Sequence, residues 1–120
     1  MKILGAGYSV PKRKVTSEEL ETMMDFEKFN IRRGMSKLLS GVNERGFAED
    51  NEDSSDYAVR AGKMAIESSG LAPEDIDLLL FCSITSDFLE PATAMKIRED
   101  LGCCNANCYD LKNACNAFLT

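Results

Sequence analysis

The sequence predicts an α/β fold in which helices cover buried strands, and three observations support this prediction. Residues 78–82 form a continuous apolar run, which is typical of a strand buried on both faces. Helical patterns precede and follow that run, and residues 106–111 form a further candidate strand. Alternation of strand, helix and strand is typical of the α/β class.

Length and charge exclude several classes of function. The chain has 120 residues, which suits one domain, and a net charge of −6 from 14 basic and 20 acidic side chains. An acidic chain without a broad basic stripe is a poor candidate for nucleic-acid binding. No apolar run reaches the ~18 residues of a membrane helix, and the first residues lack the pattern of a secretion signal. We therefore expect no nucleic acid and no membrane span.

The cysteine and histidine counts restrict the chemistry. Five cysteines without an export signal indicate free thiols in a reducing compartment, so we expect a cytoplasmic protein. The chain has no histidine, so any catalytic histidine would have to lie on other polypeptide. Cys103, Cys104 and Cys108 are close in sequence, but they form no C-x-x-C pair and no second cluster follows. Packed or surface thiols are therefore expected there, and no metal site.

The first ten residues predict a short strand that enters a loop. This segment starts apolar, carries Gly5 and Gly7, and is followed by Pro11. The glycines have two interpretations, the start of a dinucleotide-binding loop or a close turn of the backbone. The second is preferred, because Val10 and Pro11 do not continue a dinucleotide fingerprint.

Thr16 and Glu19 have the spacing of a capping box and predict a helix start. Apolar residues at helical spacing follow: Leu20, Met23 and Met24. Residues 28–37 are basic and are interrupted by Gly34. This stretch has two interpretations, a contact for phosphates or an acidic partner, and a solvated loop.

A longer helix is predicted over residues 54–69. The acidic run at residues 49–53 precedes it, as expected where carboxylates stabilise the positive end of a helix, and Gly70 ends it. Residues 72–75 predict a single helical turn before the buried strand. A further helix is expected from Pro91, as its first residue, to Gly102.

Cys115 is the candidate nucleophile. It lies where the predicted strand 106–111 turns into a segment that begins like a helix. Backbone amides and the dipole at a helix start stabilise a thiolate, which is the nucleophilic form of cysteine. A packed structural thiol is the alternative interpretation of Cys115.

Several segments together resemble thiolase-fold condensing enzymes, specifically the 3-oxoacyl-(acyl carrier protein) synthase III group. The resemblance covers nearly the whole chain in the right order. Its strongest part has an Asp, three residues, Ala-Cys, a small residue and Phe, here Asp110-Leu111-Lys112-Asn113-Ala114-Cys115-Asn116-Ala117-Phe118. The other parts are the opening strand and loop, the segment Ser40-Gly41-Val42-Asn43-Glu44-Arg45, residues 70–86, and residues 91–102.

This resemblance implies the N-terminal part of a layered α/β/α/β/α thiolase fold. It implies an acyltransferase of fatty acid or related acyl-chain biosynthesis, in which Cys115 accepts an acyl group and a second thioester attacks it in a Claisen condensation. Acyl-CoA or acyl carrier protein thioesters would be the substrates, with no permanently bound cofactor, in a homodimer. The family's His and Asn come from the C-terminal half, which residues 1–120 do not include. We therefore expect an incomplete N-terminal domain that is inactive in isolation.

Two departures from the family pattern concern binding and mechanism. Close relatives carry an aromatic residue and an Arg that hold the nucleotide of coenzyme A where this chain has Leu38 and Leu39. That role would fall to Arg32 or Arg33. Glu90, in a Leu-Glu-Pro sequence, resembles the glutamate base of olefin-forming thiolases, which join two acyl chains head to head. In those enzymes the neighbouring subunit contributes this glutamate.

Three alternatives therefore stay open. Glu90 is either a base whose pKa is raised in an apolar tunnel, or a carboxylate that complements the start of the following helix. Head-to-head acyl-CoA condensation is the alternative to the synthase III reaction. A non-catalytic α/β binding module, in which Cys115 is only a packed thiol, is the alternative from a different class.

Overall fold

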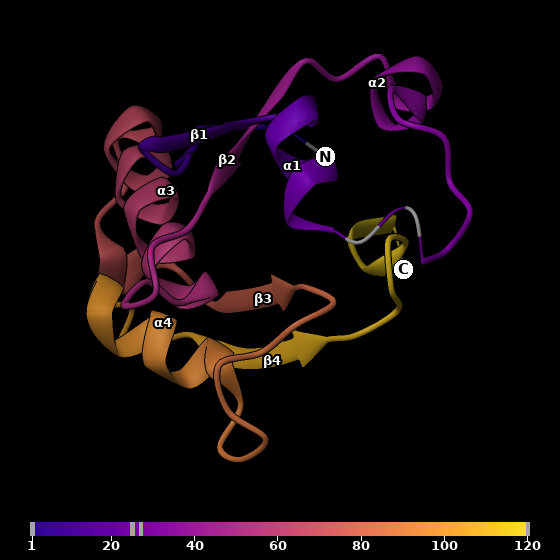
Figure 1. Ribbon diagram of the computed structural model, residues 1–120. Helices are drawn as coiled ribbons and strands as arrows, with labels where there is room; N and C mark the ends of the chain where they lie inside the picture. Colours follow the sequence, from indigo (N-terminus) through magenta and orange to yellow (C-terminus); the bar gives the residue numbers. More distant parts are fainter. Residues whose placement is uncertain (1, 25, 27, 120) are drawn as a thin grey trace. The chain divides into compact units, whose positions relative to one another are not determined.

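The computed structural model describes residues 2–24, 26 and 28–119, and its chain combines helices with short strands (Figure 1). These residues fall into two compact units. The hairpin unit is Val10–Asn51, and the sheet unit combines Met1–Ser9 with Glu52–Thr120. The mixture of helix and strand confirms the predicted α/β class.

Two antiparallel strands, β1 (Arg13–Thr16) and β2 (Glu44–Phe47), form the hairpin unit's sheet. Helix α1 (Ser17–Met23) follows β1 directly and starts with the predicted capping box. Glu19 N donates to Thr16 Oγ1 at 3.1 Å, and Thr16 N donates to Glu19 Oε2 at 2.8 Å. Both bonds satisfy amides that a helix start leaves without partners.

A second short helix, α2 (Met35–Ser40), forms within and after the basic stretch, and the sequence did not predict it. The buried carboxylate of Glu21 accepts from Gly34 N at 2.7 Å and from Ser36 N at 3.0 Å. Because a carboxylate suits the amides at a helix start, Glu21 ties α2 to α1. The partners of Glu21 lie 13 and 15 residues away, so no local sequence pattern predicts α2.

The sheet unit contains two parallel strands, β3 (Leu78–Cys82) and β4 (Asn107–Leu111). Helix α4 (Thr93–Leu101) connects them and packs on both strands and on helix α3 (Ser54–Ser69) (Figure 1). Small and branched residues fill the core between these elements: Val59, Ala94, Ile97, Cys103 and Ala106. Alanines let the helices approach the sheet closely, so the strand–helix–strand connection is compact.

Several sequence predictions for the sheet unit are confirmed. Helix α3 has the predicted bounds, and Gly70 ends it with a φ of +73°. The predicted single turn is the 3₁₀ helix η1 (Pro73–Asp75). Both β3 and β4 lie where strands were expected.

The strand predicted in residues 1–10 is wrong for residues 2–10, which the structure describes. Residues of this segment lie along α3, where Ala6 N donates to Ser68 Oγ at 3.0 Å. A Cβ on Gly5 would come within 2.3 Å of Ala65 O, and one on Gly7 within 2.1 Å of Ala61 O. The glycines therefore permit close approach to the backbone of α3, and the structure shows no turn at them of the kind that was preferred.

Full burial of the strand on both faces is also wrong within the described residues. Leu78 is 53% exposed and Leu80 is 47% exposed, whereas Leu79 and Phe81 are half-buried. On β4, Tyr109 is 56% exposed. Helix α4 covers one face of the strands, and side chains that alternate along a strand leave the apolar residues of the other face exposed.

Helix α4 does not start at Pro91, so this prediction is wrong as well. The helix begins at Thr93, and the Glu90–Pro91 peptide bond before it is cis. The start is set by Asp110 of β4, whose Oδ2 accepts from Thr93 N at 2.9 Å and whose Oδ1 accepts from Ala94 N at 2.8 Å. Gly102, with a φ of +74°, ends α4 as predicted.

Candidate functional site

Cys115 lies on a sharp bend after strand β4. The preceding residue, Ala114, has a φ of +44°, a left-handed conformation that costs energy for any residue with a Cβ. Asn116 N donates to Asn113 O at 2.9 Å and closes the turn around the cysteine. Cys115 is exposed within the described part of the chain.

The segment after Cys115 differs from the expected helix. It forms one 3₁₀ turn, η2 (Ala117–Leu119), with Ala117 N donating to Ala114 O at 3.3 Å.

Asp110 connects the nucleophile's strand to helix α4. It lies five residues before Cys115 on β4, and its two oxygens accept from the first amides of the helix, Thr93 N and Ala94 N. An ionised acceptor at a helix start forms hydrogen bonds stronger than those of a neutral cap. The C-terminal end of β4, which leads to Cys115, is therefore hydrogen-bonded to the start of α4.

Glu90 is exposed in the loop of residues 83–92, between β3 and α4. It lines a hollow of about 350 Å³ together with Leu89, Ala92, Cys108, Tyr109, Asp110 and Lys112. Leu89 is 92% exposed. Asp110 caps the start of α4, and Glu90 is among the residues that line the hollow.

The same loop contains a buried carboxylate, Asp87, whose side chain is only 3% exposed. Asp87 Oδ1 accepts from Ser54 Oγ at 2.7 Å and from Ser55 N at 3.4 Å, both at the start of α3. Lys96 Nζ lies 3.8 Å from Asp87 Oδ2. Burial alone would raise the pKa of Asp87, but bonds from Ser55 and Ser54 and the Lys96 charge together hold this pKa below its usual value.

Arg32 and Arg33 belong to the hairpin unit, where both are exposed just before α2. Leu38 and Leu39 of α2 are 75% and 78% exposed. The two leucines lie on the exposed surface of the helix that starts two residues after Arg33. Arg32 and Arg33 therefore remain candidates for nucleotide binding.

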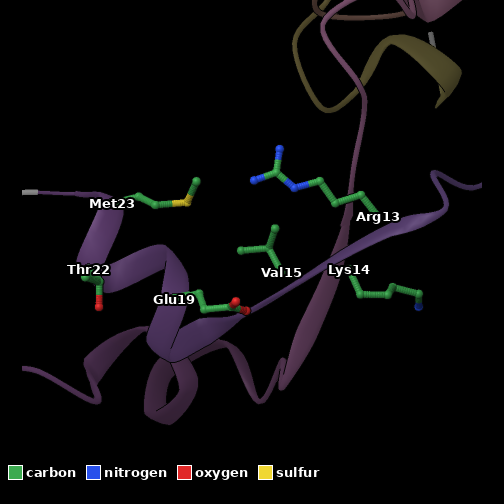
Figure 2. Close-up of a pocket in the computed structure, with 6 residues that line it drawn as sticks. All are labelled: Arg13, Lys14, Val15, Glu19, Thr22 and Met23. Carbon is green, nitrogen blue, oxygen red and sulfur yellow. The ribbon is translucent and has the colours of Figure 1, made fainter.

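A second hollow, of about 320 Å³, lies in the hairpin unit beside β1 and α1. Figure 2 shows its lining, with Val15 and Met23 as apolar residues and the guanidinium of Arg13 beside them. Arg13 lies 5.9 Å from the centroid of the Phe47 ring, and Lys14 Nζ lies 3.1 Å from Glu44 Oε1. The lining also includes the acidic Glu19, so charges of both signs surround its apolar residues.

The described residues contain no group of three His, Cys, Asp or Glu side chains arranged to hold a metal ion. The cysteines at positions 103, 104 and 108 differ in exposure, since Cys103 is buried and Cys104 is exposed. Burial raises the pKa of the Cys103 thiol, with a smaller contribution from Cys104. No described helix is long and apolar enough to cross a membrane.

The sequence did not indicate the roles of Asp87, Thr93 and Lys96. Asp110 was part of the resemblance, but its role as the cap of α4 was not recognised. Asp87 and its partner Ser54 are 33 residues apart, and Lys96 and Ser55 are 41 apart, so no local spacing could reveal them. A threonine near a predicted helix start was the one available signal, and Thr93 is the first residue of α4, after the N-cap Ala92.

The chain is similar in sequence to known proteins. The chain is 38% identical over 117 residues to a beta-ketoacyl-(acyl-carrier-protein) synthase III of Symbiobacterium thermophilum, and 41% identical over 117 residues to one of Bacillus anthracis. These matches cover 98% of this chain but only 34% and 36% of the relatives. No family model matches the chain.

The chain is also similar to solved structures. The 3-oxoacyl-(acyl-carrier-protein) synthase III of Aquifex aeolicus matches with a TM-score of 0.85 and 28% identity over 98% of this chain and 36% of its own. OleA of Xanthomonas campestris matches with a TM-score of 0.85 and 27% identity over 98% of this chain and 35% of its own. The chain thus spans about a third of the length of the proteins that it matches.

Proposed function

Because the chain belongs with the 3-oxoacyl-(acyl carrier protein) synthase III group of thiolase-fold condensing enzymes, as an amino-terminal segment, we propose that it carries the nucleophile of an acyltransferase. Cys115 is the residue that accepts the acyl group. The product of the complete enzyme is a 3-oxoacyl thioester of fatty acid or related acyl-chain biosynthesis.

The placement of Cys115 is the observation that supports this proposal most directly. Its thiol is exposed, it follows a strand end, and the left-handed Ala114 makes the bend on which it lies. Nucleophiles of acyl transfer need such access, because the thioester carbonyl must approach the sulfur closely. A cysteine kept only for packing would be buried, as Cys103 is.

In the first half-reaction, the Cys115 thiolate attacks the carbonyl carbon of an acyl thioester. The new bond joins Cys115 Sγ to that carbon, and the bond between the carbon and the donor's sulfur breaks. The donor leaves as a thiolate, which takes up a proton. A thiolate suits both directions, since it is a good nucleophile and a good leaving group.

In the second half-reaction, a carbanion from a second thioester attacks the acyl carbon. A carbon–carbon bond forms, and the bond from that carbon to Cys115 Sγ breaks, which restores the thiolate. The histidine and asparagine that assist this step in the family come from its C-terminal half. Residues 1–120 contain no histidine, so the isolated chain is expected to show no condensing turnover.

The test is intact-mass analysis of the full-length protein after incubation with acyl thioesters of several chain lengths. An adduct with the mass of the acyl group is expected, and Cys115→Ala abolishes it. Cys104→Ala, at another exposed cysteine, is the matched control and keeps the adduct. An adduct that persists in Cys115→Ala, or a lack of any adduct on the native protein, contradicts the proposal and favours a non-catalytic module.

Head-to-head condensation of two acyl-CoA molecules, with Glu90 as base, is the second candidate. The observation in its favour is that Glu90 lines a hollow beside Tyr109 while Asp110 serves as the helix cap. In the full-length protein, Glu90→Gln is expected to suppress condensation and to leave acylation of Cys115 intact. Condensation at the native rate in this variant excludes Glu90 as the base.

Coenzyme A or an acyl carrier protein is proposed as the acyl carrier, with Arg32 and Arg33 as nucleotide or phosphate contacts. The double variant Arg32→Ala/Arg33→Ala is expected to raise KM for the acyl thioester with little change in kcat, because these side chains bind without touching the reacting atoms. Lys63→Ala, at an exposed cation of α3, is the control. A homodimer is proposed as well, and sedimentation of the full-length protein tests it.

A further inference from the structure

Glu21 is a buried carboxylate in the last turn of α1 that the proposed chemistry does not use. It is 6% exposed, whereas Glu18 and Glu19 of the same helix are exposed. Burial of a carboxylate is costly in free energy unless hydrogen-bond donors replace the water that it loses. The donors here are the backbone amides of Gly34 and Ser36, in the same hairpin unit. Both oxygens of the carboxylate are therefore used to hold residues 34–36.

Arg32 and Arg33 lie between two backbone positions that hydrogen bonds hold in place. On one side, Ile31 N donates at 2.9 Å to the carbonyl oxygen of Phe26, a residue that is 8% exposed. On the other side, Gly34 N donates to the buried carboxylate at 2.7 Å. Both arginine side chains are exposed. The two guanidinium groups therefore extend into solvent from a short segment of backbone that is anchored at both ends.

The bend at Gly34 depends on the carboxylate. Gly34 has a φ of +86°, and a Cβ at this position would have no neighbouring atom within 4 Å. Packing around Gly34 therefore does not select its conformation, and glycine adopts many others at little cost. The bonds from Gly34 N to Glu21 Oε2 and from Ser36 N to Glu21 Oε1 favour this one conformation. Without these bonds the bend would be free to change, and the arginines that precede it would turn with it.

We propose that Glu21 is a positioning residue for binding of the acyl carrier, because it fixes the bend from which Arg32 and Arg33 reach the carrier's phosphates. This inference rests on the proposed function, with the two arginines as phosphate contacts. A guanidinium group binds phosphate through two parallel hydrogen bonds, so its orientation affects affinity. In acyl-CoA the pantetheine arm separates these phosphates from the thioester. Loss of the carboxylate therefore weakens binding and leaves the chemical step unchanged.

The test compares Glu21→Gln with Glu18→Gln in the full-length protein, with the acyl adduct on Cys115 followed by mass. With acyl-CoA, Glu21→Gln is expected to raise the half-saturating concentration about threefold or more at an unchanged limiting rate. With acyl-N-acetylcysteamine, which lacks the phosphates, both constants stay native, and this also reports that the variant is folded. Glu18→Gln removes the same charge from an exposed position of α1 and is expected to leave both donors unaffected.

A second variant separates the position of the carboxylate from its charge. Glu21→Asp keeps the charge but shortens the side chain, and it is also expected to raise the half-saturating concentration of acyl-CoA. A lower value in Glu21→Gln would mean that the native carboxylate acts by repelling phosphate, and it would overturn the inference. Equal losses with both donors, or loss of the adduct with both, would indicate a general structural role and would overturn it as well.

A double-variant cycle separates this inference from the proposal on which it rests. In the Arg32→Ala/Arg33→Ala background, Glu21→Gln is expected to add no further rise, because positioning matters only when the arginines are present. Additive rises overturn the inference. If Arg32→Ala/Arg33→Ala alone leaves the half-saturating concentration native, the proposed phosphate contacts fail first. If it raises this concentration while Glu21→Gln does not, only the positioning role of Glu21 fails.

Discussion

The carboxylate of Asp110 accepts from the backbone amide of Thr93 at 2.9 Å, across 17 residues of sequence. Its other oxygen accepts from Ala94 N at 2.8 Å, so both bonds join strand β4 to the first turn of α4. The side chain that caps the helix therefore lies on the strand that leads to the reactive cysteine. Loss of this cap would loosen the helix start and the strand end together.

Asp110→Asn is expected to lower the free energy of unfolding by about 1–2 kcal/mol, because the amide loses the charge and one of the two acceptors. Thermal or urea unfolding of the full-length protein measures this change. Asp100→Asn, at an exposed position in the last turn of α4, is the control and is expected to change stability by less than about 0.5 kcal/mol. Equal effects of the two substitutions would contradict the capping role.

Gly7→Ala is expected to destabilise the protein by about 1–3 kcal/mol, since the new methyl would overlap the backbone of α3 at Ala61 O, 2.1 Å away. Denaturant unfolding gives the value. The neighbouring exposed residue provides the comparison, and Ala6→Ser is expected to have a small effect. A Gly7→Ala protein of native stability would mean that the segment does not lie against α3.

The pKa of Asp87 predicts a pH dependence of stability. Its folded pKa is below the unfolded value of about 3.9, so its stabilising contribution is present above that value and is lost as pH falls through the folded pKa. The difference in unfolding free energy between the native protein and Asp87→Asn is therefore expected to be largest near neutral pH and to shrink in acid. A difference that is constant from neutral pH to pH 3 would contradict this assignment.

Alkylation is expected to distinguish the adjacent thiols Cys103 and Cys104. Burial raises the pKa of Cys103 and its side chain is 1% exposed, so iodoacetamide should modify it far more slowly than the exposed Cys104. Peptide mass mapping of the native protein follows both sites. In denaturant the two rates should converge, and a difference that persists there would point to a cause other than burial.

Local patterns predicted the elements whose signals lie within a few residues. Helix α3 was predicted with its bounds because an acidic start and Gly70 lie at its two ends, and the box of Thr16 and Glu19 spans only four residues. Parallel strand β3 was recognised from its unbroken apolar run. The predicted turn between a strand and a helix made Cys115 a candidate nucleophile, and the resemblance to a family added its role as the acyl acceptor.

The features that the sequence did not predict depend on distant partners. Helix α2 begins where Glu21 caps it, and α4 begins at Thr93 because Asp110 binds the amides there. The antiparallel pairing of β1 with β2 joins segments about 30 residues apart, and neither strand has a strong alternating pattern. Propensity is a weak prior wherever such tertiary contacts determine the ends of an element.

The bend that carries Cys115 has an energetic cost, because Ala114 adopts a left-handed conformation there. A residue with a Cβ costs roughly 1–2 kcal/mol more in that conformation than in its ordinary one, and the surrounding chain must supply this energy. Glycine at position 114 would remove the penalty and raise the melting temperature. It would also widen the range of directions in which the Cys115 sulfur can point. The more heat-resistant protein would therefore hold its nucleophile less firmly in one orientation.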